Sequence, residues 1–367
     1  MKILFVTNLP SPYRVDFFNE LSNYCLLTVL YERHSSAERD EAWVNKEKRK
    51  FNEIYADLKP LGVDSSIGFD LVNKIKNLAY DRIIMSGYSS PSVILAIIYC
   101  RLKNIPYIME DDGGLFSEKQ ERFSSLKKML LKKTRAYFTT TDQNVEMLIR
   151  LGVKKSKIYK YPFSSVLKED IKKNSSLVLE KEYIKKKLNI SEDKIILTVG
   201  QFIYRKGFDV LLNAVSNIKS DYGVYIIGGN PTEEYKRIIK EKKLKNIHFI
   251  GFQTKNELKN FYAIADIFVL PTREDIWGLV INEAMSYGLP IITTYKCGAG
   301  LEMIENGKNG FLVDVGDEKM LAQKIIYLLE NDELRAKIRK VNLEKIEKYT
   351  IEEMALSHIK ILSQLEE

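Results

Sequence analysis

The sequence is poor in the residues that bind soft metals or form covalent cross-links. It has three cysteines, Cys25, Cys100 and Cys297, and three histidines among 367 residues. No two cysteines form a Cys-x-x-Cys pair, so we expect neither a thiolate zinc site nor a disulfide framework. With three histidines, a histidine-rich metal centre is not expected either. The general base is expected to be a carboxylate or a group of the substrate. The low cysteine content fits a reducing cytoplasm.

Long apolar runs are also missing. A membrane-spanning helix needs about 18 consecutive apolar residues, and the nearest run, from Val93 to Cys100, has eight. The apolar stretch at residues 3–6 is too short for a signal peptide and is soon followed by Pro10. We therefore expect a cytoplasmic protein that is soluble or bound peripherally at the inner face of the cell membrane.

The charge balance is basic, with 57 lysines and arginines against 49 acidic residues and a net charge of +8. A basic surface attracts phosphates, nucleic acid or anionic lipid, although a general preference for lysine would give the same excess. No stretch interleaves aromatic and basic residues as nucleic-acid-binding motifs do. The expected partners are therefore a phosphate-bearing ligand and an anionic membrane surface, and no nucleic acid.

Short β-branched runs alternate with amphipathic helical stretches along the whole chain. This alternation is typical of β-α-β units and parallel sheets. At about 150 residues per domain, the length predicts two doubly wound α/β domains of six strands each. The predicted strands are Ile3–Val6, Leu26–Tyr31, Arg82–Met85, Pro106–Met109, Tyr137–Thr141, Ile158–Tyr161, Ile195–Gly200, Val224–Gly229, Ile247–Gly251, Ile267–Thr272, Ile291–Thr294 and Gly310–Val313.

Residues 161–191 break this rhythm, because they contain a proline, two serine pairs and many lysines and glutamates. We place the boundary there, with domains over residues 1–165 and 166–350. The last segment, 351–367, has apolar residues at helical spacing and is predicted to form a helix with one buried face. Its spacing does not say which domain it covers, and the first domain is one candidate.

In open parallel sheets, ligands bind beyond the carboxyl ends of the strands. The most informative segment of this kind is 270–290, where a strand leads through an acidic loop into a helix that ends at a Gly-Leu-Pro sequence. The N–H groups at the predicted helix start, those of Gly278, Leu279 and Val280, are placed to bind a phosphate. Glu283 lies about one turn further along, where a carboxylate can accept two ribose hydroxyls.

Other loops of the same half offer cations and glycines. Arg205 and Lys206 follow the predicted strand 195–200 and bring fixed positive charge to the same phosphates. The glycine pair at 228–229 lets a ligand approach the backbone, and residues 248–252 are placed to present main-chain groups to a planar base. Each feature alone is equally explained as a turn or a solvated pair, but their coincidence at the strand ends of one domain favours a nucleotide site.

These features resemble the retaining nucleotide-sugar glycosyltransferases of family 4, which have the GT-B fold. The resemblance rests on two acids eight positions apart after a strand, Asp275 and Glu283. It also rests on an earlier loop, residues 200–207, which begins and ends with glycine and contains an arginine followed by a lysine. It covers the C-terminal half with specific motifs and the N-terminal half by strand rhythm and length. The implied fold is two Rossmann-like, doubly wound parallel-sheet domains facing a central cleft, with the acceptor bound by the first domain and the donor by the second.

The sequence departs from the family pattern at the first acid, which is an aspartate. The resemblance therefore implies that Asp275 or its neighbour Glu274 contacts the donor sugar. It also implies that the departing phosphate oxygen takes the acceptor proton, so no metal and no other cofactor is expected beyond the nucleotide-sugar substrate. The residues implied to bind the donor diphosphate and ribose are Gly200, Arg205, Lys206, Gly278, Leu279, Val280 and Glu283.

In the first half, one predicted strand ends in Glu110, Asp111 and Asp112, followed by Gly113 and Gly114. The family often has a catalytic-site histidine at this strand end, so the resemblance implies that Asp112 faces the acceptor hydroxyl or the donor sugar. The alternative is a metal-binding Asp-x-Asp motif, as in the other large glycosyltransferase fold. Two strand-helix halves instead of one argue against that alternative.

Residues 123–133 read as a helix with Leu126, Met129 and Leu130 on one side and lysine pairs beside them. Such a basic amphipathic helix can rest on anionic lipid headgroups and bring the site close to a lipid-linked acceptor. An ordinary surface helix of the first domain is the alternative, and the sequence does not decide between them.

The sequence therefore predicts a metal-independent glycosyltransferase that moves a sugar to a hydroxyl of a glycan or lipid-linked acceptor, as in cell-surface polysaccharide synthesis. The family resemblance makes a UDP-sugar the expected donor. The alternative is a nucleotide-sugar epimerase or hydrolase of the same fold, although the Arg-Glu-Asn-type loop of such epimerases is not found. A dinucleotide dehydrogenase is disfavoured, because the first strand leads to Asn8, Leu9 and Pro10 instead of Gly-x-Gly-x-x-Gly.

Overall fold

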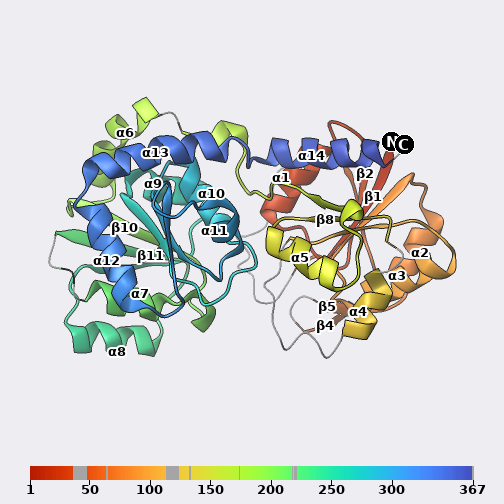
Figure 1. Cartoon of the computed structure of the whole chain (residues 1–367), viewed down its shortest axis with the longest axis horizontal. Helices are drawn as coiled ribbons and strands as arrows, with labels where there is room; N and C mark the ends of the chain where they lie inside the picture. The colour runs from red at the N-terminus through yellow and green to blue at the C-terminus, as the bar shows by residue number, and fades with distance from the viewer. Residues whose placement is uncertain are drawn as a thin grey trace. The chain divides into compact units, whose positions relative to one another are not determined.

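The computed structural model describes residues 1–35, 48–62, 65–112, 124–131, 134–172, 174–216, 218 and 221–365, and for 124–127 and 174–180 only the backbone. The chain divides into two compact units. Unit 1 comprises Met1–Ser165 and Thr350–Glu367, and unit 2 comprises Val166–Tyr349. Each unit is a parallel sheet with helices on its faces (Figure 1), so the α/β fold class predicted from the sequence is confirmed.

Unit 1 contains a seven-stranded sheet in the order β3-β2-β1-β6-β7-β8-β9, with every neighbouring pair parallel. The prediction of six strands was wrong, because Asn52–Tyr55 forms the additional strand β3. This edge strand buries little apolar surface, so it lacks the continuous β-branched run that marks the central strands. The other strands are β1 (Lys2–Thr7), β2 (Leu26–Tyr31), β6 (Arg82–Ser86), β7 (Ile108–Glu110), β8 (Ala136–Thr139) and β9 (Ile158–Lys160).

Helices of unit 1 cover the sheet, and a short antiparallel hairpin, β4 (Lys59–Leu61) with β5 (Ser65–Ile67), lies outside it. Two of the helices start with proline, whose fixed backbone angle suits the first helical position. The apolar side chains of the central strands pack against these helices and form the core. The helices are α1 (Pro12–Leu21), α2 (Asp70–Asn77), α3 (Pro91–Leu102), α4 (Ser124–Leu131) and α5 (Asp142–Arg150).

The last helix, α14 (Ile351–Gln364), belongs to unit 1, where it packs beside α1 (Figure 1). Thr350 caps its first turn, and its side-chain oxygen accepts a hydrogen bond from the backbone N–H of Glu353. Its buried face contains the predicted apolar residues Met354 and Leu362, but also His358, which is completely buried. A buried histidine on this face was not anticipated from the spacing of apolar residues.

Unit 2 contains a six-stranded sheet in the order β12-β11-β10-β13-β14-β15, again with all neighbours parallel. The six predicted strands of this half are all present, with ends displaced by at most two residues. They are β10 (Lys194–Val199), β11 (Tyr222–Ile227), β12 (Ile247–Ile250), β13 (Ile267–Leu270), β14 (Ile291–Thr294) and β15 (Gly310–Val313).

The helices of unit 2 bury their apolar faces against this sheet, most extensively α7 and α12, whose leucines and isoleucines pack on the β-branched side chains of the central strands. Among the described residues, no helix is long and apolar enough to cross a membrane. The helices are α6 (Asn174–Lys187), α7 (Phe208–Val215), α8 (Glu233–Lys242), α9 (Lys255–Ile264), α10 (Leu279–Ser286), α11 (Gly298–Met303), α12 (Glu318–Leu329) and α13 (Asp332–Ile346).

The strand order of each sheet reverses at one point. In unit 1 the chain moves outward in opposite directions from β1 and β6, and in unit 2 from β10 and β13. A crevice forms outside the carboxyl ends of the strands at such a reversal, because the connecting loops on its two sides turn to opposite faces of the sheet. These two places are therefore where ligand-binding side chains are expected.

Candidate functional site

The loops that follow β10 and β13 meet at the reversal point of unit 2. The backbone N–H of Arg273 donates to the carbonyl oxygen of Arg205 at 2.8 Å, and Thr272 Oγ1 donates to the same oxygen at 2.9 Å. In the other direction, the Arg205 guanidinium donates to the carbonyl oxygen of Glu274 at 2.8 Å. The two loops that the sequence singled out separately are thus one structural element.

The side chain of Arg273, in the loop after β13, binds residues that follow β10. Its guanidinium makes a two-pronged ion pair with Asp209, at 2.9 and 2.6 Å, and lies over the ring of Tyr204, 3.9 Å from the ring centre. Tyr204 and the two predicted phosphate-binding cations share a single 3-10 turn, Tyr204–Lys206. A bidentate arginine holds a fixed geometry, so Arg273 fixes the turn that presents both cations. Arg273 was not singled out in the sequence.

Lys206 and Asp275 are in direct contact within this element. Lys206 Nζ lies 2.6 Å from Asp275 Oδ2, and an Arg205 guanidinium nitrogen lies 3.4 Å from Asp275 Oδ1. The side chains of Lys206 and Asp275 are 12% and 11% exposed, while that of Arg205 is 43% exposed. The structure therefore brings the predicted phosphate cations and one predicted sugar-binding acid together, and each cation is paired with Asp275.

Of the two acids considered for the sugar contact, only Asp275 is shown to pair with these cations. Glu274 is exposed, and its carbonyl oxygen accepts a hydrogen bond from the Arg205 guanidinium of the neighbouring loop. Gly200 lies beside Lys206, since a Cβ on Gly200 would sit 3.3 Å from the Cε of that lysine. Gly200, Lys206 and Asp275 therefore line one place in unit 2.

Helix α10 begins at Leu279, one residue later than predicted, with Gly278 as its cap in a left-handed conformation. A Cβ on Gly278 would lie 2.8 Å from Cys297 Sγ, so both the backbone angle and the close packing require glycine. The first N–H groups of an α-helix have no acceptor within the helix, and those of Leu279 and Val280 belong to this set. The helix start predicted after β13 is therefore present, and its binding of an anion stays a prediction.

Glu283 lies in the second turn of α10 and is partly buried. Its Oε2 accepts a hydrogen bond from the Tyr262 hydroxyl at 2.9 Å. Burial, and then the nearby carboxylate, raise the pKa of Tyr262 well above its ordinary value, so the hydroxyl keeps its proton and remains a donor. Tyr262 thus fixes one side of the carboxylate predicted to bind ribose.

In the glycine pair at 228–229, the structure gives Gly228 a packing role in addition to the ligand approach predicted from the sequence. A Cβ on Gly228 would lie 2.4 Å from the carbonyl oxygen of Gly200, so the glycine allows the loops after β10 and β11 to touch each other.

The ring of His248 pairs with Glu192 at 2.5 Å, and Glu192 precedes β10. That pair lies toward the amino ends of the strands, away from the loops that hold Lys206.

We expect Gly207→Ala to disrupt the cation turn. Gly207 has φ +68°, and a Cβ there would lie 2.1 Å from the carbonyl oxygen of Pro271, at the end of β13. Relieving this overlap requires the two loops to separate, which we expect to cost about 1–3 kcal/mol of stability. Urea unfolding measures the effect. The matched control is Gly251→Ala, where a Cβ meets nothing within 4 Å, and equal stability of the two variants would contradict the assignment.

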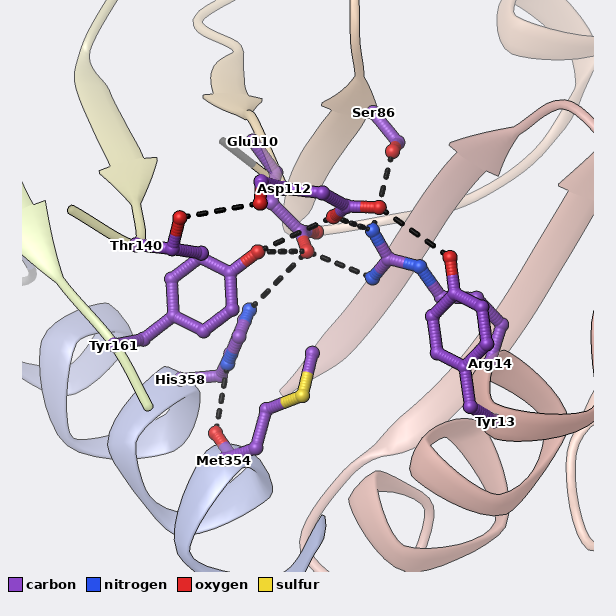
Figure 2. A network of polar contacts seen from close by, with 9 residues as sticks. All are labelled: Tyr13, Arg14, Ser86, Glu110, Asp112, Thr140, Tyr161, Met354 and His358. Atoms are coloured by element: carbon purple, nitrogen blue, oxygen red, sulfur yellow. Dashed lines mark hydrogen bonds and ion pairs between the residues drawn. The ribbon is translucent and has the colours of Figure 1, made fainter. Parts of the chain in front are cut away.

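Asp112 belongs to a second polar cluster, at the reversal point of unit 1 (Figure 2). Arg14, in the first turn of α1, donates to Glu110 Oε1 at 2.7 Å and also contacts Asp112 Oδ1. The hydroxyl of Tyr161 donates to Glu110 Oε1 at 2.9 Å and lies 3.3 Å from Asp112 Oδ1, and the hydroxyl of Tyr13 lies 3.4 Å from Asp112 Oδ2. The predicted acceptor-side carboxylate is therefore held from three sides.

Burial differs sharply within this cluster. The side chains of Arg14 and Glu110 are 3% and 0% exposed, whereas that of Asp112 is 29% exposed. Burial and the nearby Glu110 carboxylate raise the pKa of Asp112, while Arg14 opposes this shift. Burial also acts on Glu110, but the Arg14 guanidinium and His358 outweigh it and lower the pKa of that carboxyl. Asp112 is thus the partly accessible member of a buried ionic network.

The alternative interpretation of Asp112, as part of a metal-binding Asp-x-Asp motif, has to account for an arginine that already pairs with this carboxylate. The Arg14 guanidinium supplies the positive charge between Glu110 and Asp112, so these carboxylates already share a cation. Within the described ranges, no group of three or more His, Cys, Asp or Glu side chains is arranged to hold a metal ion. Gly113 and Gly114 lie outside the described residues. Arg14 itself was not predicted as a site residue, although it is the one arginine of the segment that follows β1, at residues 8–21.

The predicted membrane-binding helix corresponds to α4 (Ser124–Leu131). Its side chains are described only from Lys128 onward: Lys128 and Met129 are exposed, while Leu130 and Leu131 are buried. Leu126 and Lys127 are described by their backbone only, and Lys132 and Lys133 lie outside the described residues. Membrane contact through this helix stays a prediction.

Comparison with known proteins gives consistent matches. Residues 180–344 match the model of the family Glycosyl transferases group 1. A relative from Campylobacter jejuni, N,N'-diacetylbacillosaminyl-diphospho-undecaprenol alpha-1,3-N-acetylgalactosaminyltransferase, is 24% identical over 323 residues, which cover 84% of each chain. Against several other relatives, the matched stretch spans about half the length of the relative.

Two solved structures share the architecture of the whole chain. A glycosyltransferase from Rickettsia africae has a TM-score of 0.79 at 19% sequence identity. The match covers 100% of this chain and 98% of that one. HepE from Anabaena, in complex with UDP and glucose, has a TM-score of 0.76 at 18% identity, with 99% of this chain and 100% of that chain covered. Residues 180–344 are therefore similar to the group 1 glycosyltransferases, and the chain has the GT-B fold of two parallel-sheet α/β domains.

Proposed function

We propose that this protein transfers a sugar from a nucleotide diphosphate donor to a hydroxyl group of a glycan or lipid-linked acceptor, with retention of the anomeric configuration. The observation that carries the proposal is the convergence of Lys206, Arg205 and the start of α10 with Asp275 at the reversal point of unit 2. Two cations and a helix start suit a diphosphate. A carboxylate beside them suits the hydroxyl groups of the attached sugar.

The proposed reaction breaks the bond between the anomeric carbon and the diphosphate oxygen and forms a bond from that carbon to the acceptor oxygen. The acceptor proton passes to the departing phosphate oxygen on the same face of the sugar. Negative charge develops on the diphosphate in the transition state, and donors already aimed at it provide stabilisation without reorganisation. Lys206, Arg205 and the first N–H groups of α10 have this role.

Asp275 has a second role in this scheme. In this structure it pairs with Lys206 at 2.6 Å, which reduces the cost of holding a lysine in a site where its side chain is only 12% exposed. When the diphosphate binds, Lys206 gains a second anionic partner. Asp275 then has the freedom to accept hydrogen bonds from the sugar hydroxyls, and Glu283 accepts those of the ribose.

The relatives support two finer parts of the proposal. HepE has been solved with UDP and with UDP-glucose, which supports a uridine nucleotide. The Campylobacter jejuni relative is named for a diphospho-undecaprenol substrate, which supports a lipid-linked acceptor and a protein bound peripherally to the membrane. The donor sugar is selected by hydroxyl contacts around Asp275, so we leave its identity to experiment.

A panel of nucleotide sugars tests the proposal. Ligands that bind only the folded protein raise its thermal stability, so we expect a UDP-sugar to raise the melting temperature and a UDP-sugar plus a polyprenyl-diphosphate-linked saccharide to give a glycosylated product and UDP. Turnover is expected to persist in a strong chelator. Rapid release of free or epimerised sugar without acceptor would instead support an epimerase or hydrolase and overturn the proposal.

Glu283→Gln is expected to raise the donor KM about 10- to 100-fold with a smaller change in kcat. The carboxylate would lose charge-assisted hydrogen bonds to the ribose, each worth about 1.5–3 kcal/mol, while the reacting atoms stay in place. Steady-state kinetics with varied donor measures the change. Glu305→Gln, at an exposed carboxylate of the same unit, is the control, and an unaltered donor KM in Glu283→Gln would remove Glu283 from the site.

A further inference from the structure

Helix α14 brings a buried histidine to the Asp112 cluster of unit 1, as Figure 2 shows. The side chain of His358 is 0% exposed. Its ring packs against those of Phe17, Phe138 and Tyr161, with centres 4.9, 5.2 and 4.6 Å away. A polar ring buried among three aromatic rings requires a reason, because burying it without satisfied hydrogen bonds costs free energy.

The hydrogen bonds of His358 indicate where its protons are. Nδ1 lies 2.7 Å from the carbonyl oxygen of Met354, and a carbonyl can only accept, so Nδ1 carries a proton. Nε2 lies 3.9 Å from Glu110 Oε1. Among the described residues, neither Nε2 nor Glu110 Oε2 has a hydrogen-bond partner. A neutral ring with its proton on Nδ1 would turn a lone pair toward this carboxylate, whereas a doubly protonated ring turns an N–H and a positive charge toward it.

Charge balance favours the doubly protonated ring. Among the residues that the structure describes, the charged groups paired with Glu110 or in contact with its partner Arg14 are Arg14 from α1, Asp112 beyond β7 and His358 itself. The other titratable neighbours are the hydroxyls of Tyr13 and Tyr161. With His358 charged, two cations face two carboxylates and the cluster is neutral. With His358 neutral, one guanidinium faces two carboxylates, and a buried carboxylate without a counter-charge is strongly unfavourable.

Arg14 links the two carboxylates, because it contacts Glu110 with one guanidinium nitrogen and Asp112 with the other. A charge on His358 compensates Glu110, so that the guanidinium remains available to compensate Asp112. Without that charge, the cheapest way to remove the excess negative charge is to protonate Asp112, whose pKa is already raised by burial and by Glu110. The ionisation of Asp112 therefore depends on a residue of the last helix.

We propose that Arg14 and His358 are positioning residues that keep Asp112 ionised and oriented, with His358 carrying both ring protons, so that the C-terminal helix α14 completes the Asp112 cluster of unit 1. The participation of Asp112 in turnover rests on the function proposed above together with the role that the family resemblance implies for Asp112, facing the acceptor hydroxyl or the donor sugar. The protonation of His358 does not, because it follows from the contacts inside unit 1 alone.

The protonation of His358 is measured by NMR of the protein labelled with 15N-histidine. The chain has only three histidines, so loss of one set of ring signals in His358→Gln assigns His358. At pH 7.5 we expect both of its ring nitrogens to show the chemical shifts of an imidazolium. A shift typical of an unprotonated Nε2 at that pH would overturn the proposal, whether or not a substrate is known.

The coupling to Asp112 is measured by the pH profile of kcat/KM for sugar transfer. His358→Gln leaves the cluster with a net charge of −1, so the pKa of Asp112 should rise and the acidic limb should move to higher pH by about one unit or more. Glu110→Gln leaves +1 and should move that limb to lower pH. The double variant is neutral again, and its limb should return close to that of the wild type.

A purely structural role for His358 predicts a different pattern. Leu362→Ala removes a buried side chain from the same face of α14 and should lower the stability of unit 1 without moving the acidic limb. If the three charge variants only lower the melting temperature, and their pH profiles coincide with that of the wild type, the positioning role is wrong. If no sugar donor is turned over at all, the proposed function fails, while the NMR result still decides the protonation of His358.

Discussion

Lys206→Ala is expected to lower kcat/KM for the sugar donor by about 100- to 1000-fold. Removing one preorganised donor from a site where anionic charge develops costs about 2.7–4 kcal/mol of transition-state stabilisation in other enzymes. Lys206 is the less exposed of the two cations in the turn after β10 and makes the shorter contact with Asp275, at 2.6 Å. Steady-state kinetics with saturating acceptor and varied donor measures the loss.

Two further variants separate the effect on the donor from an effect on the fold. Lys206→Ala also leaves Asp275 without its shortest ion pair, which by itself destabilises unit 2. Lys206→Ala combined with Asp275→Asn restores the charge balance, so we expect recovery of thermal stability but no recovery of donor turnover. Lys308→Ala breaks a lysine–carboxylate pair on the surface of the same unit and should leave kcat/KM unchanged. Full activity in Lys206→Ala would contradict the diphosphate assignment.

Arg14→Leu is expected to have the largest effect on stability, about 3–5 kcal/mol in the free energy of unfolding of unit 1. The reason is that removing one partner of a buried ion pair leaves an uncompensated charge, and here Glu110 is completely buried with the Arg14 guanidinium 2.7 Å away. Hydrogen exchange of peptides from α1 and β7, followed in increasing urea, reports on this unit separately from unit 2.

The Arg14 prediction has its own controls. Arg14→Leu combined with Glu110→Gln removes one negative charge together with the positive one, so part of the lost stability should return. Arg49→Leu breaks a pair with Glu53 that is more exposed, and we expect a change below about 1 kcal/mol. Equal destabilisation by Arg14→Leu and Arg49→Leu would show that the buried network contributes no more than a surface pair.

The pH dependence of this network follows from the direction of its pKa shifts. Burial opposes ionisation of Glu110, but Arg14 and His358 lower its pKa below the ordinary value for a glutamate. A carboxyl with a lowered pKa in the folded state contributes stability above its unfolded pKa and loses it as the pH falls toward the folded value. Asp112 shifts upward, so its contribution has the opposite sign and partly offsets that of Glu110 in the acidic range.

Much of unit 2 was predictable because its signals are local. The six strands are buried β-branched runs separated by helices, and their carboxyl ends converge on one edge of a parallel sheet. Residues that follow β10 and β13 must therefore lie close together if the strands are neighbours, as they are. That is why the loops around Lys206 and Asp275 could be grouped before their contacts were known.

The contacts inside the two sites were not predictable in the same way. Lys206 and Asp275 are 69 positions apart, and Arg14 and Glu110 are 96 apart. Periodicity and capping signals describe neighbours within a few residues, and they give no register between distant segments. Strand β3 was missed for a related reason, since a partly exposed edge strand does not need the apolar run that identifies a central one.

The sequence by itself determined that this is an α/β protein with parallel sheets, that cations and glycines follow particular strands, and that its last segment is a helix with one apolar face. Only the tertiary structure decided that this helix covers unit 1, that Asp275 pairs with both cations, and that Arg14 and His358 surround Glu110. The physical reason is that backbone periodicity is written into short stretches of sequence. The partner of a buried charge depends instead on which distant segments pack together and exclude water from it.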